Sequence, residues 1–313
     1  MHLLRHLDDL PAPLRKRGSA VTIGSFDGLH LGHQQLLAAV RSAATSRDLN
    51  SIVMSFEPAP TEYFQAASPP ARLMRFREKF EALVKQDINI FYCPRFSADM
   101  RQLSAPDFVR RILVHGLNVR HIVVGDDSRF ARRREGDVEL LRTMSAPLGY
   151  SVKQVPSVIV SGDRVSSTAI RAACAEGDMS RATTLLGRPY RMSGKVIRGE
   201  QMGRKLGFPT ANVDLRRRQS AVMGIFAVRV SGLGDSPLDG VASVGTRPTF
   251  DGTKPILEIH LFDFSEDIYG RYIEVDFIAR LREQKRYESV DGLVAQMHID
   301  ADNARTILAE AAA

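Results

Sequence analysis

The sequence predicts two domains of different class, an α/β domain with a doubly wound parallel sheet followed by an antiparallel β-barrel domain with a terminal helix. The chain has 313 residues, which is more than a single hydrophobic core usually organises. Its first half alternates apolar runs with helical periodicity, whereas apolar runs follow one another without helices in its second half. The pattern changes near Gly187, so we expect domains at residues 1–186 and 187–313.

Five apolar runs in the first half are expected to form parallel strands. Between them, apolar side chains recur three or four residues apart, as on one face of a helix, around Leu36, Phe76, Phe108 and Val138. Helices between consecutive strands cover both faces of a parallel sheet, and ligands bind such sheets at the carboxyl ends of the strands. The expected strands are Val21–Ile23, Ile52–Phe56, Ile88–Tyr92, Ile122–Val124 and Val152–Val155.

The second half begins after two expected helices. The first spans Thr168–Glu176, and a shorter one ends at Leu185 and Leu186, just before Gly187. Strands without helices between them favour an antiparallel sheet or a small barrel, and a final helix is expected near Leu293–Leu308. The expected strands are Met192–Ile197, Ile225–Val230, Val241–Val244, Leu257–Phe262 and Ile273–Phe277.

The composition argues against several classes of protein. Hydrophobic residues make up 44% of the chain and charged residues 25%, as in ordinary globular proteins, and no apolar run reaches the length of a membrane span. Cys93 and Cys174 are far apart and form no CxxC motif, which disfavours a disulfide framework and a zinc site. We therefore expect a cytoplasmic protein with no membrane partner.

The net charge of +7 raises the question of a nucleic-acid partner. Two arginine runs, Arg132–Arg134 and Arg216–Arg218, contribute to it, but no recognised nucleic-acid motif accompanies them. We interpret both runs as solvated loops, or as a source of attraction for anionic nucleotides. The expected partners are small molecules, and the oligomeric state is left open.

The loop after the first expected strand has the composition of a phosphate-binding site. It runs from Gly24 to His33 and opens a helix, an arrangement in which free backbone N–H groups receive phosphate. His30 and His33 are three residues apart, so they can face the same way at the helix start. Two alternatives are metal ligands, although no Cys or further His lies nearby, and ordinary polar residues in a turn. The GxGxxG and GK[ST] motifs are absent.

The longer pattern GxFDGxHxGH resembles the signature of the HxGH nucleotidyltransferases, and among them the adenylyltransferase module of bacterial bifunctional riboflavin kinase/FAD synthetases. The segment Ser166–Arg171 at a helix start, which read alone is an ordinary N-cap, is similar to a motif that closes the site in that family. The resemblance implies that His30 and His33 act on the phosphates of ATP and that Ser167, Thr168 and Arg171 hold the triphosphate from the other side. It implies ATP contacts for Gly24, Phe26, Asp27, Gly28, His30, Gly32 and His33.

A second loop, Gly125–Ala131, is similar to the GxDFRFG loop of the same family. Asp127, Arg129 and Phe130 match that pattern, which implies that they lie around the nucleotide and the flavin. Ser128 and Ala131 depart from it. A plain polar loop after a strand is the alternative for this segment.

In the second half, the run Gly199–Asn212 ends in PTAN and resembles the ATP loop and metal motif of riboflavin kinases. The resemblance implies that the Thr210 hydroxyl and the Asn212 amide oxygen hold Mg²⁺, a hard ion that prefers oxygen ligands. Without the resemblance, the run reads as a long loop between strands. The residues implied to contact ATP are Gly199, Gly203, Arg204, Gly207, Pro209 and Thr210.

Glu258 follows a GTRPTF segment on an expected strand, in the position that riboflavin kinases give to their general base. The resemblance implies that it accepts the proton of the riboflavin 5′-hydroxyl as that oxygen attacks the γ-phosphate of ATP. Read alone, Glu258 would be an exposed residue on an alternating strand. Arg282 is implied as a contact of the flavin or the nucleotide.

The resemblance as a whole implies a bifunctional enzyme, which phosphorylates riboflavin to FMN in the second domain and adenylylates FMN to FAD in the first, releasing pyrophosphate. ATP is the co-substrate and Mg²⁺ the metal. Two alternatives remain. The kinase alone could be active, since Ser128 and Ala131 depart from the adenylyltransferase pattern, or the chain could be a basic nucleic-acid-binding protein with a nucleotide-sensing domain.

Overall fold

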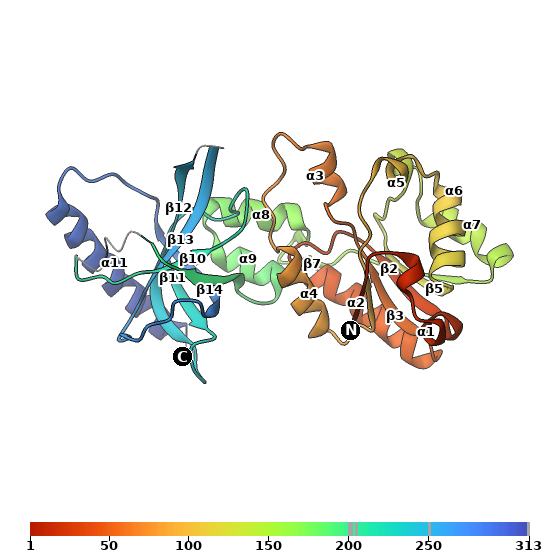
Figure 1. Cartoon of the computed structure of the whole chain (residues 1–313), viewed down its shortest axis with the longest axis horizontal. Helices are drawn as coiled ribbons and strands as arrows, with labels where there is room; N and C mark the ends of the chain where they lie inside the picture. The colour runs from red at the N-terminus through yellow and green to blue at the C-terminus, as the bar shows by residue number, and fades with distance from the viewer. Residues whose placement is uncertain (200–202, 204–205, 250–251, 312–313) are drawn as a thin grey trace. The chain divides into compact units, whose positions relative to one another are not determined.

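The computed structural model describes residues 1–199, 203, 206–249 and 252–311, and the chain forms two compact units (Figure 1). Unit 1 contains Met1–Pro70 and Met74–Ser166, and unit 2 contains Ala71–Leu73 and Ser167–Ala313. Two helices that precede Gly187 thus belong to unit 2; they are α8 (Ser167–Glu176) and α9 (Met179–Leu186). The expected boundary at Gly187 stays a prediction.

Unit 1 is built on a six-stranded parallel sheet in the order β1-β4-β3-β2-β5-β6. Strand β2 lies between β3 and β5, so the order reverses at β2, and the loop that follows this strand lies at the switch point where open α/β sheets bind ligands. The strands are β1 (His2–Leu4), β2 (Ser19–Ile23), β3 (Asn50–Met54), β4 (Ile90–Tyr92), β5 (Val119–Gly125) and β6 (Ser151–Val155).

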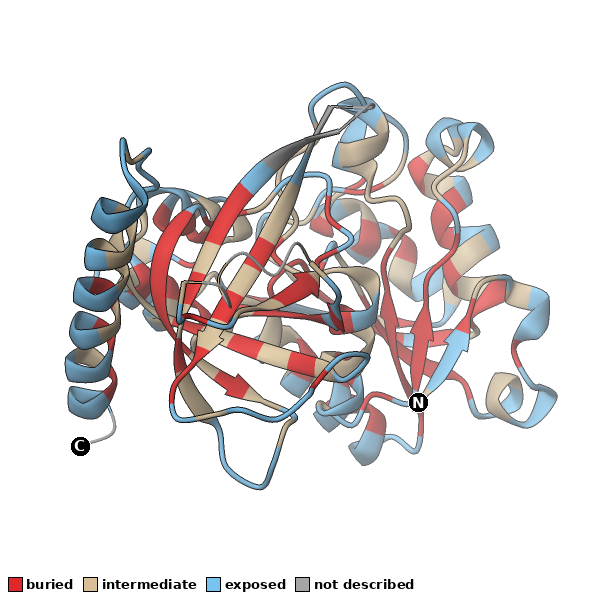
Figure 2. Cartoon of the chain, turned by 60° about the vertical axis from the view of Figure 1, so that its left-hand side comes forward, coloured by how far each residue is buried: buried red, intermediate tan, exposed pale blue. Residues whose placement is uncertain are grey.

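Alternate side chains of these strands enter two separate hydrophobic cores, one on each face of the sheet. In β3, Ile52 and Met54 join one core and Val53 the other; in β4, Ile90 and Phe91 divide in the same way. Burial on both faces explains why the central strands read as continuous apolar runs, and Figure 2 shows these strands mostly buried. The predicted parallel sheet covered on both faces is confirmed.

Helices and short turns connect the strands of unit 1. Helix α2 packs against β2, β3 and β5, and α7 packs against β6. The helical segments are η1 (Leu7–Asp9), α1 (Ala12–Arg17), α2 (Leu31–Ser46), α3 (Pro60–Phe64), α4 (Phe76–Val84), α5 (Ala98–Gln102), α6 (Ala105–Asp107), η2 (Phe108–Gly116), η3 (Arg132–Arg134) and α7 (Val138–Leu148). A short hairpin of β7 (Ile159–Val160) and β8 (Asp163–Arg164) follows β6.

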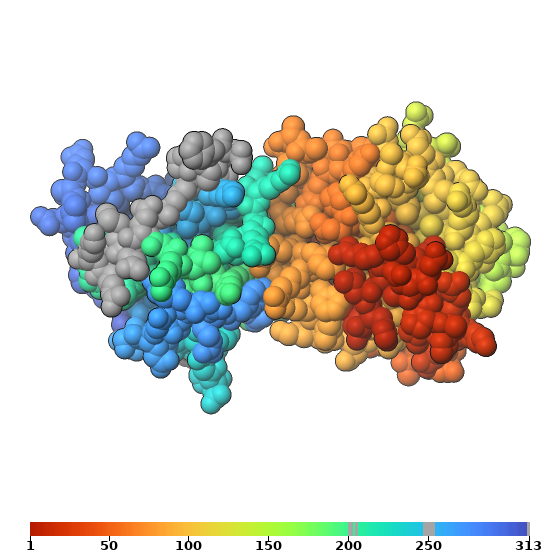
Figure 3. Space-filling model, viewed as in Figure 1, coloured from red at the N-terminus to blue at the C-terminus, as the bar shows by residue number. Residues whose placement is uncertain are grey.

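Unit 2 is a closed antiparallel barrel in the order β10-β13-β12-β11-β14-β9, as the second half of the sequence predicts. Helix α11 (Val290–Glu310) packs against it, with Ala304 and Leu308 buried beside Ala227 and Phe262, and lies at the surface of the unit (Figure 3). The strands are β9 (Tyr190–Ile197), β10 (Ala211–Asp214), β11 (Gly224–Ser231), β12 (Leu238–Thr249), β13 (Gly252–Leu261) and β14 (Tyr272–Arg282). Within the described part of the chain, no helix has both the length and the apolarity needed to cross a bilayer.

Candidate functional site

The glycine-rich loop of unit 1 follows β2 and leads into α2. Phe26, Gly28 and Leu29 have φ values of 49°, 87° and 45°, in the left-handed region that L side chains seldom occupy. The Phe26 side chain is fully buried, which anchors the loop, and the Asp27 Oδ1 atom accepts a hydrogen bond of 2.8 Å from the Met74 N–H. The rest of the unit therefore holds the loop in a conformation that isolated chains disfavour.

His30 is the N-cap residue of α2. Its Nδ1 atom accepts a hydrogen bond from the His33 N–H at 3.2 Å. A nitrogen that accepts carries no proton, so the proton of the neutral His30 ring is on Nε2, which can donate to a phosphate oxygen. Gly32 keeps the turn compact, since a Cβ there would lie 3.3 Å from the His30 ring.

The two imidazoles stack on each other, with ring centroids 3.6 Å apart and planes at 16°. Burial lowers the pKa of His30 to about 4, against the opposing effect of the Asp27 carboxylate. Burial, the neighbouring His30 and the Lys79 ammonium hold the pKa of His33 well below its usual range. Both rings are therefore neutral at pH 7, and each presents one N–H donor.

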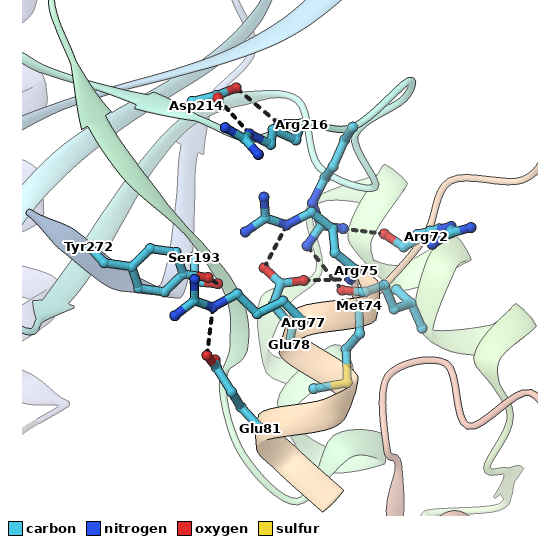
Figure 4. Close-up of polar contacts among 12 residues, drawn as sticks. Arg72, Met74, Arg75, Arg77, Glu78, Glu81, Ser193, Asp214, Arg216 and Tyr272 are labelled. Atoms are coloured by element: carbon cyan, nitrogen blue, oxygen red, sulfur yellow. Dashed lines mark hydrogen bonds and ion pairs between the residues drawn. The ribbon is translucent and has the colours of Figure 1, made fainter. Parts of the chain in front are cut away.

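Lys79 is a residue of this site that the sequence analysis missed. It lies on α4 with its side chain 6% exposed, and its Nζ atom donates to the Ser25 carbonyl oxygen at 2.6 Å, inside the glycine-rich loop. The start of α4 is fixed by the Glu78 carboxylate, which accepts from the Arg75 N–H, and Arg77 pairs with Glu81 further along (Figure 4). The feature of the sequence that could have revealed Lys79 is the position of a lysine within the apolar stripe of this helix.

We predict that Lys79→Met raises the pKa of His33, because the change removes a cation that lowers it. Burial and His30 still act, so the pKa should stay below its usual range. NMR titration of the His33 ring in the full chain measures the effect. Lys85→Met, which removes a cation from the exposed end of α4, is the control. A His33 titration that is the same in both variants would contradict the prediction.

The acidic residues of the second loop of unit 1, Gly125–Ala131, contact the segment that follows β6. The Asp126 carboxylate accepts from the Ser157 hydroxyl and N–H, and Asp127 forms an ion pair with Arg164. Phe130 is 7% exposed and packs against Phe108, with ring centroids 5.5 Å apart. This packing is a sufficient structural reason for an aromatic residue at position 130. Contacts of Asp127, Arg129 and Phe130 with nucleotide or flavin stay a prediction.

The segment expected to close the nucleotide site belongs to unit 2. Ser167 and Thr168 begin α8, and the Arg171 Nε atom donates to the Ala71 carbonyl oxygen at 2.7 Å. That these three side chains hold a triphosphate remains a prediction.

Unit 2 contains a cavity of about 280 Å³ whose wall includes Thr210, Asn212, Glu258 and Arg282. Asn212 of β10 and Glu258 of β13 are directly opposite each other in an antiparallel pair, so their side chains share one face, with Cβ atoms about 5 Å apart. Asn212 is 7% exposed and Glu258 is half-buried. The structure thus brings together residues that the sequence placed in three separate segments.

Two glycines of the loop beside this cavity, Gly199 and Gly203, leave no room for a side chain. A Cβ at Gly199 would lie 2.4 Å from the Asn212 amide, and one at Gly203 would lie 2.3 Å from the Phe208 carbonyl oxygen. Gly207 has a φ of 82°. The Pro209 carbonyl oxygen accepts a hydrogen bond of 3.0 Å from His260 Nδ1. Arg204, also expected here, lies outside the described residues.

The terminal helix also lines this cavity, through Leu293, Met297, Asp300 and Ala301. The sequence analysis assigned α11 no role in the site. The spacing of apolar residues in this helix predicts which of them pack against the barrel. It does not predict the direction of the carboxylate side chains.

One arginine run was misinterpreted as a solvated loop. The Arg217 side chain is buried, and its Nη1 atom donates to the Arg72 carbonyl oxygen at 2.5 Å. Arg216 does lie at the surface, where it pairs with Asp214 (Figure 4). The run therefore contains a buried anchor as well as exposed charge.

Comparison with known proteins identifies both halves of the chain. The FAD synthetase family model matches residues 12–169, and the riboflavin kinase family model matches residues 186–308. A bifunctional riboflavin kinase/FMN adenylyltransferase of Escherichia coli K12 is 43% identical to this chain over 97% of each. The chain belongs to the bifunctional riboflavin kinase/FMN adenylyltransferase family. The member of this family from Pseudomonas fluorescens is 42% identical over 100% of this chain and 99% of its own.

The solved structures include a similar fold. A crystal structure of a macrolide-efflux protein from Streptococcus pneumoniae has a TM-score of 0.81 and 30% identity, covering 97% of this chain and 98% of that one. The predicted fold class and the predicted membership of the riboflavin kinase/FMN adenylyltransferase family are confirmed.

Proposed function

We propose that the chain phosphorylates riboflavin with ATP to give FMN in unit 2, and adenylylates FMN with ATP to give FAD at the His30 and His33 loop of unit 1. Identity over nearly the full length of bifunctional relatives supports both activities. The observation that carries the kinase assignment is the shared face of Asn212 and Glu258 in one cavity.

In the kinase reaction, Glu258 acts as general base. Its carboxylate takes the proton of the riboflavin 5′-hydroxyl, that oxygen bonds to the γ-phosphorus of ATP, and the bond from the γ-phosphorus to the bridging oxygen breaks to leave ADP. A second cavity of about 400 Å³ shares Thr210 with the first and includes Pro209, Phe264 and Tyr269. The shared Thr210 supports the proposal that the flavin and the nucleotide occupy different cavities, with the transferred phosphate between them.

For Mg²⁺, we propose Thr210 and Asn212 as protein ligands. Their hydroxyl and amide oxygens suit this hard ion, and both residues line the cavity that contains Glu258. Among the described residues, no group of three or more His, Cys, Asp or Glu side chains is arranged to hold a metal. A site with two protein ligands fits an ion that keeps waters and binds the phosphates of its substrate. Bound there, Mg²⁺ would neutralise phosphate charge.

In the adenylyl transfer, the FMN phosphate bonds to the α-phosphorus of ATP, and the bond between the α- and β-phosphates breaks to release pyrophosphate. A phosphate monoester is already ionised near neutral pH, so no strong base is needed. The neutral rings of His30 and His33 instead offer N–H donors, and the loop and the helix start offer backbone N–H groups, to the charge that develops.

One assay separates this proposal from its alternatives. Purified protein is incubated with riboflavin, ATP and Mg²⁺, and FMN and FAD are followed over time. The proposal requires FMN to appear first and FAD to follow. FMN without FAD would favour a kinase with an inactive first unit. No flavin turnover, together with a salt-dependent shift of DNA or RNA, would favour the nucleic-acid-binding alternative. A cytoplasmic location remains part of the proposal.

We predict that a fragment Ser167–Ala313 phosphorylates riboflavin and that one starting at Arg188 gives less folded protein. Helix α9 packs against β9 and β14, and its Leu185 and Leu186 are buried, so removing it exposes apolar surface of the barrel. Soluble yield and FMN production of both fragments measure the effect. Equal yield and activity would show that α8 and α9 add nothing to the barrel.

A further inference from the structure

An ion pair inside the kinase cavity joins the barrel to the terminal helix. Arg282, at the end of β14, donates from Nε to Asp300 Oδ1 at 2.9 Å and from Nη2 to Asp300 Oδ2 at 2.7 Å. This is the bidentate geometry that fixes both the position and the plane of a guanidinium. Both residues line the cavity that also contains Glu258.

Asp300 is itself held in place. It is 4% exposed, and the Gln296 amide, one turn earlier on α11, donates to its Oδ1 atom at 3.0 Å. A buried carboxylate is costly unless it is paired and hydrogen-bonded, and here both conditions are met. The hydrogen bonds that Arg282 donates to the Asp300 carboxylate also raise the pKa of Arg282 above its usual value. Gln296, Asp300 and Arg282 thus form one connected polar group.

Within the described part of the chain, the hydrogen bonds of Arg282 leave part of its donor capacity available to a ligand. Nε and Nη2 each give one N–H to Asp300, and Nη1 gives one to the Glu283 carbonyl oxygen at 3.0 Å. A guanidinium has five N–H groups, so one remains on each terminal nitrogen. Because the Asp300 carboxylate offsets the positive charge, these donors suit a neutral acceptor better than a phosphate.

The surroundings of the pair favour a planar, mostly apolar ligand. Leu293, Met297 and Ala301 of α11 line the cavity together with Ile225 and Val241 of the barrel. Such a wall with a few fixed donors is typical of sites for aromatic ligands that carry carbonyl groups. Among the substrates of the proposed kinase reaction, riboflavin fits that description, since its ring system is neutral and has carbonyl acceptors.

We propose that Asp300 is a positioning residue for riboflavin phosphorylation. Supported by Gln296, it holds the Arg282 guanidinium so that the remaining N–H groups meet the flavin ring. This inference rests on the proposed kinase function of unit 2. It gives the terminal helix a part in substrate recognition in addition to its packing against the barrel.

The test uses the full-length chain with Asp300→Asn, Arg282→Met and the double variant. Asp300→Asn should raise the KM for riboflavin on the order of 10- to 100-fold, the usual effect of losing a charge-assisted hydrogen bond, with the KM for ATP nearly unchanged. If Asp300 acts through Arg282, adding Asp300→Asn to Arg282→Met should raise that KM by less than about threefold more. Losses that multiply in full, or a rise confined to the KM for ATP, would overturn the proposal.

Two further variants keep the test decisive. Asp302→Asn removes an exposed carboxylate from the same helix and should leave both KM values unchanged. Gln296→Ala leaves the ion pair intact but removes its support, and should raise the KM for riboflavin severalfold even if Asp300→Asn gives little folded protein. An unchanged KM for riboflavin in Gln296→Ala would contradict the proposal that Gln296, Asp300 and Arg282 act together in positioning the flavin. Absence of any riboflavin phosphorylation by the unaltered chain would instead refute the kinase function itself.

Discussion

Replacing Glu258 by glutamine is expected to slow riboflavin phosphorylation about 10²- to 10⁴-fold, the usual effect of removing a general base. Glutamine keeps the shape of the side chain and can still accept a hydrogen bond, but it cannot take the proton of the 5′-hydroxyl. The side chain is half-buried in the cavity wall opposite Asn212, so the substitution changes the chemistry at that place without opening a void. The fall should be in kcat, with KM values nearly unchanged.

The experiment uses one preparation and two substrates. Supplied FMN should still be converted to FAD, because the proposed adenylyl transfer uses His30 and His33 and no residue of the barrel strands. Glu288→Gln, at an exposed position of the same unit, is the matched control and should phosphorylate riboflavin normally. Near-normal phosphorylation of riboflavin by Glu258→Gln would show that Glu258 has no catalytic role, and its assignment as general base would be withdrawn.

The sequence predicts the long elements of this fold because their patterns are local. Continuous apolar runs such as those of β3 and β5 follow from burial on both faces of a parallel sheet. Strands β1, with three residues, and β10, with four, were missed because neither belongs to a longer apolar run, as the equally short β4 does. Both are placed by pairing with a partner distant in sequence, β1 with β4 and β10 with β13.

The candidate sites show the same division. Resemblance to riboflavin kinase motifs predicted that Asn212 and Glu258 belong to the kinase site. The sequence did not show that they lie on one face of the sheet, which follows from the pairing of β10 with β13. Lys79 and Asp300 belong to no motif. Their roles depend on contacts with Ser25, 54 residues away, and with Arg282, 18 residues away. Such contacts are set by tertiary packing, so a single sequence gives at most a hint, as with a lysine in an apolar helix stripe.

Replacing His33 by alanine is expected to slow FAD formation on the order of 10²- to 10³-fold, the typical cost of losing one preorganised donor to a developing charge. His33 stacks on His30 and is half-buried, and its backbone N–H is held by His30 Nδ1. The substitution removes the ring but keeps that backbone contact, so the start of α2 should persist. Riboflavin phosphorylation, assigned to unit 2, should continue at a nearly normal rate.

Two controls make this result interpretable. Kinase activity reports only on unit 2, so circular dichroism of the thermal transition is needed to show that unit 1 remains folded. His115→Ala, at an exposed position of unit 1, should leave both reactions unchanged. If the His33 variant remained folded and FMN production fell in parallel with FAD production, the division of the two reactions between the units would be wrong. If FAD formation were unaffected, His33 would be a packing residue, and the donors for the α-phosphate would have to be sought in His30 and the backbone of the loop.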